Sequence, residues 1–233
     1  MPTRRLKPKT VDADGHVLEP RDTWLRYLDP EYRDRPIQLV MEEKGEVLLV
    51  DGKPVRKLRN RTALLGGIDH DPDVLLRGGR HMVYEDGCPA GGYDPAARIK
   101  VMDEEGIDIS LLYPTIGICW EGKVTDAGLA TAYTRAYNRW LVEFCSHNPK
   151  RLVPIAHISL LDPELAVNEM QRAAKDGCRG IYISPDLKPR AMRHFDHSEL
   201  DKVWATAQDL DLPIGFHLSL IHISEPTRLG KIS

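Results

Sequence analysis

Short apolar runs alternate with longer amphipathic stretches along the chain beyond residue 95. The short runs resemble buried strands, and the longer stretches follow the 3.6-residue period of helices. The predicted helices span residues 96–105, 126–146, 163–175 and 198–209, and the predicted strands span residues 108–114, 152–159, 180–184 and 212–217. Gly106 and Gly177 stand where helix C-caps are expected. Regular alternation of this kind predicts an α/β fold built on a parallel sheet.

The N-terminal part of the chain follows a different pattern. An apolar entry at residues 11–16 predicts a first strand. Residues 38–42 and 46–50 form two apolar runs separated and followed by turn residues, which predicts a small antiparallel insertion after that strand. Glycine and proline are frequent at residues 60–92, and no periodicity persists there, so we expect a long loop that serves as a lid. The whole insertion is placed at residues 37–92.

A carboxylate and an imidazole stand two residues apart at the end of the first predicted strand. Residues i and i+2 of a strand point to the same face, so Asp14 and His16 can bind one cation together. Asp12 has the same parity, and Glu19 follows in the exit loop, which adds hard oxygen donors. An acidic loop without a metal is the alternative interpretation, because this spacing is short and common.

Composition narrows the classes of function. A net charge of -3 over 233 residues gives no basic surface for nucleic acid. No apolar run approaches the roughly 18 residues of a membrane-spanning helix, and the N-terminus lacks the apolar segment of a signal peptide. We therefore expect a cytoplasmic protein that binds neither nucleic acid nor membrane. The four cysteines form no Cys-x-x-Cys pair and are interpreted as reduced thiols.

Several motifs together resemble one known family. They are VDADGHVLEP at 11–20, ARIKVMDEEGID at 97–108, LYPT at 112–115, AYNRW at 136–140, PKRLVP at 149–154, GCRGI at 177–181 and PIGFH at 213–217. The set is similar to the amidohydrolase-related (amidohydrolase 2) family, in the branch that contains aminocarboxymuconate semialdehyde decarboxylase. The resemblance implies a (β/α)8 TIM barrel, here truncated at about five of eight strands, with a divalent metal at the strand C-termini.

The expected metal ligands are Asp14, His16 and His217, because all three occupy the C-terminal ends of predicted barrel strands. The first-strand pair is usually His-x-His in the decarboxylase named above, so Asp14 departs from that pattern. Zinc is the expected metal and manganese the alternative. One carboxylate and two imidazoles leave positions open for water or substrate, as a catalytic site requires.

Three further residues near the strand ends are candidates for contact with a small-molecule substrate: Glu19, Tyr113 and Trp120. Aromatic side chains at a barrel mouth can stack on an aromatic substrate, but they also fill space between loops, and both interpretations stay open. His157 lies inside a predicted strand and is interpreted as a core histidine or one that supports the site.

The resemblance implies a non-oxidative decarboxylase (carboxy-lyase) that acts on a carboxylated aromatic or muconate-like substrate. The alternatives are a metal-dependent hydrolase of a C–N or C–O bond and an inactive half-barrel that only binds a metal or a partner. By resemblance the catalytic residues are a histidine on the sixth strand and an aspartate on the eighth, beyond His217. We therefore expect this chain to be inactive and its full-length parent to be an enzyme, with a homodimer as a further expectation.

The last sixteen residues, 218–233, resemble an in-frame translation of a transposase sequencing adapter. A native strand exit is the alternative, since residues 218–223 alternate in part between apolar and polar. The expected organisation is a partial metal-dependent barrel at residues 1–217 followed by a non-native tail.

Overall fold

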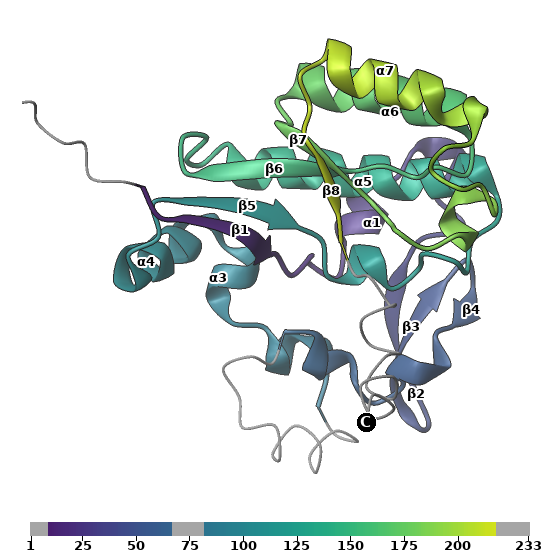
Figure 1. Cartoon of the computed structure of the whole chain (residues 1–233). Coiled ribbons are helices and arrows are strands. Elements are labelled where there is room, and N and C mark those ends of the chain that lie inside the picture. Colours follow the sequence, from purple (N-terminus) through teal and green to yellow (C-terminus); the bar gives the residue numbers. More distant parts are fainter. Residues whose placement is uncertain (1–8, 67–81, 218–233) are drawn as a thin grey trace, which may run out of the picture.

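Five parallel strands form a curled sheet in which the order along the sheet equals the order along the chain (Figure 1). A computed structural model describes residues 9–66 and 82–217. The strands are β1 (Val11–His16), β5 (Ile109–Tyr113), β6 (Leu152–His157), β7 (Gly180–Ile183) and β8 (Ile214–Phe216). The fold is an α/β half-barrel, which agrees with the truncated barrel expected from the sequence. The predicted tail at 218–233 lies outside the described residues.

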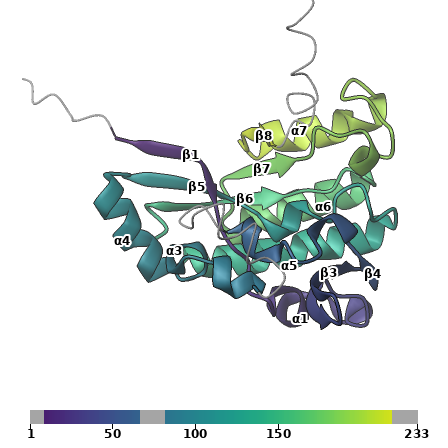
Figure 2. The same ribbon diagram turned by 90° about the horizontal axis from the view of Figure 1, so that it is seen from below.

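Helices connect these strands as the sequence pattern predicts. They are α4 (Pro95–Glu105), α5 (Ala127–Cys145), α6 (Pro163–Asp176) and α7 (Asp201–Asp209). In the view from below, α4 lies next to β5 at one end of the sheet and α7 lies next to β8 at the other (Figure 2). In the described part of the chain, no helix combines the length and apolarity needed to cross a membrane.

Side-chain caps and left-handed glycines set the ends of the helices. The Asp94 carboxylate accepts a hydrogen bond from the Ala97 amide, and the Asp162 carboxylate accepts from two amides of the first turn of α6. Gly106 has a φ of 70° and Gly177 a φ of 115°, values that favour glycine. The two predicted C-caps are therefore confirmed.

The predicted insertion contains a three-stranded antiparallel sheet. Its strands are β2 (Gln38–Glu42), β3 (Gly45–Val50) and β4 (Lys53–Pro54). The remaining helices of the described residues are α1 (Thr23–Tyr27) and α3 (Ala90–Tyr93) and the short 3-10 helices η1 (Pro30–Tyr32), η2 (Arg56–Leu58), η3 (Thr62–Leu65), η5 (Tyr84–Gly87), η6 (Ile116–Ile118), η7 (Lys188–Arg190) and η8 (Ser198–Leu200). Residues 67–81 of the predicted lid lie outside the described ranges, so the lid stays a prediction.

The insertion and the parallel sheet share one core. Helix α5 is amphipathic, and its buried side chains include Leu129, Tyr133 and Leu141. They belong to a cluster of buried apolar residues that also contains Trp24 and Leu48 from the insertion. The Trp24 indole donates a hydrogen bond to the Tyr133 carbonyl at 3.2 Å. The insertion is therefore fixed against α5.

Candidate metal centre

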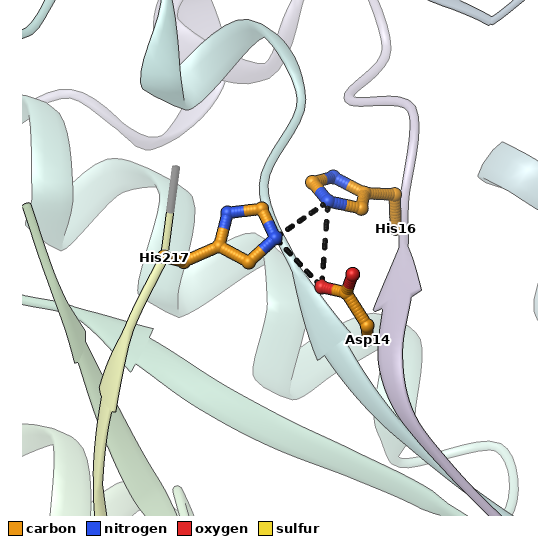
Figure 3. Close-up of side chains that lie close together, drawn as sticks. All are labelled: Asp14, His16 and His217. Carbon is orange, nitrogen blue, oxygen red and sulfur yellow. Dashed lines mark hydrogen bonds and ion pairs between the residues drawn. The ribbon is translucent and has the colours of Figure 1, made fainter. Parts of the chain in front are cut away.

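Asp14, His16 and His217 come together at the C-terminal ends of the two outermost described strands (Figure 3). His217 Nε2 lies 2.6 Å from Asp14 Oδ1 and 3.2 Å from His16 Nε2, and His16 Nε2 lies 3.9 Å from Asp14 Oδ1. Zinc ligands at bond lengths of about 2.0–2.2 Å in tetrahedral geometry lie roughly 3.4 Å apart. The three distances fall on both sides of that value, so the donor set fits a single cation.

An irregular register in β1 gives Asp14 its position. The pairing of β1 with β5 shifts between Asp12 and Gly15, and the Asp14 amide donates to the Asp12 carboxylate at 3.1 Å. Asp12 itself accepts a hydrogen bond from Ser110 Oγ at 2.7 Å, and Arg98 Nη2 lies 3.8 Å away. Asp12 shares the parity of Asp14 in the sequence, but its carboxylate is directed to these partners and not to the cluster.

Gly15 makes this arrangement possible. A Cβ at this position would lie 2.3 Å from Ser110 Oγ and 2.5 Å from Asp12 Oδ2. The same Cβ would lie 2.9 Å from Arg98 Nη2, and Arg98 Nη1 donates to the His16 carbonyl at 3.0 Å. Ser110, Asp12 and Arg98 therefore hold the end of the strand, and their packing requires a residue without a side chain between Asp14 and His16.

The His16 imidazole is held in a form suited to metal binding. Burial lowers its pKa, and the neighbouring His217 lowers it further, while Asp14 acts in the opposite direction. His16 Nδ1 lies 3.3 Å from Thr115 Oγ1. A neutral imidazole with one nitrogen on a hydrogen-bond partner presents the other nitrogen as a ligand.

Aromatic rings hold the His217 side chain from two sides. Its ring stacks on Tyr113 at a centroid distance of 5.3 Å with an interplanar angle of 18°, and it meets Tyr182 nearly edge-on at 5.9 Å. A Cβ on Gly215 would lie 3.2 Å from the Tyr113 hydroxyl, so this glycine leaves room for the stacked ring. Tyr113, predicted to contact substrate, thus adjoins the cluster.

Glu19, predicted to contact substrate, is fully buried. Its carboxylate accepts hydrogen bonds from the backbone amides of Thr115, Ile116 and Gly117 at 3.1, 2.8 and 2.9 Å. Burial raises the pKa of Glu19 to about 7, although these amides lower it. Glu19 therefore binds the backbone of the loop at residues 115–117 and is not exposed to a substrate.

Trp120, the third residue predicted to contact substrate, is 2% exposed and also lies below the surface. Its ring lies 5.4 Å from that of His157, which is buried in β6. His157 Nε2 is 2.6 Å from Glu121 Oε1, and the Tyr182 hydroxyl donates to the same oxygen at 2.8 Å. His157 therefore belongs to a buried polar group behind the ring of Tyr182.

A cavity of about 550 Å³ opens beside His16. Its polar lining groups include His16, Thr115 and Arg98, and its walls are mainly apolar. Asp14 and His217 do not line it, so the cavity reaches the cluster from the His16 side. The sequence places Thr115 directly after a strand end, where residues can line a pocket, whereas no sequence signal marked Arg98 as a site residue.

The comparisons with known proteins agree with this fold. The family model described as Amidohydrolase (Amidohydro_2) matches residues 11–232. The chain therefore belongs to the amidohydrolase family.

The chain matches only part of the length of its curated relatives. A gamma-resorcylate decarboxylase from a Polaromonas species is 30% identical over 127 residues, which are 52% of this chain and 37% of the relative. The chain thus spans little more than a third of the curated relatives it matches.

Solved structures share the fold over nearly the whole chain. The crystal structure of an amidohydrolase from Mycobacterium avium subsp. paratuberculosis has a TM-score of 0.70 at 26% identity and covers 94% of this chain and 62% of its own. A 5-carboxyvanillate decarboxylase from Novosphingobium aromaticivorans, crystallised with manganese, has a TM-score of 0.54 at 20% identity and covers 90% of this chain and 50% of its own.

Proposed function

We propose that this chain is part of a metal-dependent carboxy-lyase that removes carbon dioxide from a carboxylated aromatic substrate without oxidation. The observation that carries the proposal is the convergence of Asp14, His16 and His217, whose ligand atoms all lie within 4.8 Å of one another. The relatives named as decarboxylases of resorcylate and carboxyvanillate support the choice of substrate class.

The donor set favours a divalent cation with free coordination positions. One carboxylate and two neutral imidazoles carry a single negative charge, so a bound dication leaves a net positive centre that attracts an anionic substrate. We propose zinc as the metal, with manganese as the alternative that the manganese-containing relative supports. When bound, the cation would orient the substrate carboxylate and stabilise charge as carbon dioxide leaves.

Residues of this chain would prepare the substrate for that step. The cavity beside His16 has the volume of a site for a small organic ligand, and its apolar walls suit an aromatic ring. Arg98 lines the cavity, and its guanidinium donates to the His16 carbonyl at 3.0 Å, which holds the candidate ligand at the cavity wall. Tyr113 keeps the His217 ring in place by stacking. We propose that the acid–base residues of the whole protein lie on strands beyond β8.

A metal-dependent hydrolase is the second candidate, because the structure with a TM-score of 0.70 is named an amidohydrolase. The same cation would then activate a water molecule for attack on a carbonyl carbon. A third candidate is a half-barrel that only binds a metal or a partner. The full-length parent would separate the first two, because only the carboxy-lyase releases carbon dioxide from a dihydroxybenzoate, whereas the hydrolase cleaves an amide or ester.

The decisive experiment measures metal content and carbon dioxide release together. We expect the full-length protein to bind one equivalent of zinc or manganese and to decarboxylate 2,6-dihydroxybenzoate or a related phenolic acid. Asp14→Ala and His217→Ala should remove both properties, whereas His147→Ala, at an exposed position, should change neither. Hydrolysis of amides or esters without decarboxylation would favour the second candidate. Unchanged metal content in Asp14→Ala and His217→Ala would overturn the proposed centre.

A further inference from the structure

The carboxylate of Glu19 is the buried support of the loop that follows β5. Glu19 stands three residues after His16, and its side chain is completely enclosed. Three successive backbone amides, those of Thr115, Ile116 and Gly117, donate to its two oxygens. In the described residues these three amides have no other hydrogen-bond acceptor, so Glu19 alone satisfies them and holds the loop backbone at this point.

The loop is shaped to receive a carboxylate. Gly117 lies so close to the site that a Cβ there would be 2.7 Å from Pro114 Cβ and 3.1 Å from Glu19 Oε1. The amides belong to the start of the short helix η6, whose first N–H groups have no partner within the helix. A carboxylate accepts hydrogen bonds from these amides with both of its oxygens. A glutamine side chain would instead place its own NH₂ group against the backbone N–H groups.

Thr115 connects this loop to the candidate metal centre. Its amide is bound to Glu19 at 3.1 Å, and its hydroxyl lies 3.3 Å from His16 Nδ1. If His16 Nδ1–H donates to this hydroxyl, then Nε2 carries the lone pair. His16 Nε2 is the nitrogen that lies 3.2 Å from His217 Nε2, inside the cluster. A metal-binding histidine needs this arrangement, with its second nitrogen on an oriented partner.

We propose that Glu19 is a positioning residue for the metal centre: through the amides of residues 115–117 it places the Thr115 hydroxyl, which fixes the tautomer and ring orientation of His16. This inference rests on the proposed metal-binding function, because it assigns Glu19 and Thr115 to the same centre. It also gives Glu19 a role in metal affinity although the carboxylate touches neither the metal nor the substrate.

The test uses the full chain at pH 8, above the raised pKa of Glu19. Zinc and manganese affinities are measured by chelator competition for the wild type, Glu19→Gln, Thr115→Val and Thr115→Ser. We expect a loss of about 10- to 100-fold in Glu19→Gln and Thr115→Val, the effect typical of removing such a support. Thr115→Ser keeps the hydroxyl and should restore most of the affinity.

The imidazole nitrogen-15 shifts of His16 provide a readout that general destabilisation does not move. We expect one tautomer, protonated at Nδ1, in the metal-free wild type and a mixture in Thr115→Val. Glu46→Gln is the matched control, because Glu46 is also a buried carboxylate and accepts from the Tyr84 amide at 2.8 Å without touching the loop at 115–117. It should lower stability but leave metal affinity unchanged.

The outcomes separate the two proposals. If His16→Ala binds metal as tightly as the wild type, the metal centre itself is wrong. If His16→Ala loses the metal while Thr115→Val and Glu19→Gln retain wild-type affinity and a single tautomer, the metal centre stands and the positioning role is wrong. Should Glu19→Gln fail to fold, the pair Thr115→Val and Thr115→Ser decides, because wild-type affinity in Thr115→Val alone overturns the role.

Discussion

His217 Nε2 lies 2.6 Å from Asp14 Oδ1 although 203 positions separate the two residues in the chain. Asp14 belongs to β1 and His217 directly follows β8, which are the two outermost strands of the described parallel sheet. The curl of the sheet brings the ends of these strands together (Figure 1). The geometry of the candidate centre is therefore set by the curvature of the whole sheet and not by a local motif.

Replacing Asp14 by histidine tests what the carboxylate contributes to metal choice. We expect Asp14→His to retain metal binding, since imidazole is also a ligand, but to shift preference from manganese toward zinc by about tenfold or more. Competition binding of the two ions to wild type and variant measures the shift. Asp209→His, at an exposed position on α7, is the control and should leave both affinities unchanged. An unaltered manganese-to-zinc ratio in Asp14→His would show that Asp14 does not coordinate.

Glu19 predicts a dependence of stability on pH. Its pKa is raised to about 7, so the folded chain keeps a proton that the unfolded chain releases above pH 4.5. The contribution of this group to the free energy of unfolding is therefore full below pH 4.5 and falls as the pH rises to about 7, by roughly 3 kcal/mol if Glu19 acts alone. Urea denaturation of wild type and Glu19→Gln between pH 4 and 8 measures it. Parallel curves for the two proteins would contradict the prediction.

Gly15 should tolerate no side chain. In Gly15→Ala the new Cβ would meet Ser110 Oγ, Asp12 and Arg98 at distances below 3.0 Å, so the strand end must shift. We expect a loss of about 1–3 kcal/mol in the free energy of unfolding and weaker metal binding, because Asp14 and His16 flank the glycine. Gly91→Ala is the control, since its Cβ would first meet the exposed Val101 side chain at 3.3 Å. Equal stabilities of the two variants would be the contrary result.

Leu141 tests the shared core of the insertion and the parallel sheet. It is fully buried in α5, and its truncation to alanine leaves a cavity. We expect Leu141→Ala to lower the free energy of unfolding by about 2–5 kcal/mol. Leu25→Ala, at a site that is 52% exposed in α1, should change it by less than about 0.5 kcal/mol. Denaturant titration followed by circular dichroism provides both values.

The order of strands and helices could be predicted because local signals mark each element. Apolar runs gave the strands, and Asp162 and Gly177 mark the start and end of α6 in the sequence as they do in the structure. The predicted helix at 198–209 divides into η8 (Ser198–Leu200) and α7 (Asp201–Asp209), a difference at one helix end. Both parts follow from the same amphipathic pattern.

The candidate site could be predicted only in part. Asp14, His16 and His217 follow from their places at strand ends, and the structure brings their ligand atoms together. The burial of Glu19 depends on amides that lie 96 to 98 positions further along the chain, and such a contact leaves no local signal. The irregular register turns Asp12 toward Ser110, which lies 98 positions away, so this contact also could not be predicted from the local sequence.

The strands of the parallel sheet are neighbours in the order in which they occur along the chain. A nascent polypeptide can therefore add them one at a time, each against the strand synthesised before it. Contacts between neighbouring strands form early under this scheme, whereas Asp14 meets His217 only after every intervening strand is in place. Metal capture would then be the last event in the assembly of this half-barrel. A cation bound there would link β1 to the residue that follows β8. Its dissociation rate would then measure the stability of the contact between these two outer strands.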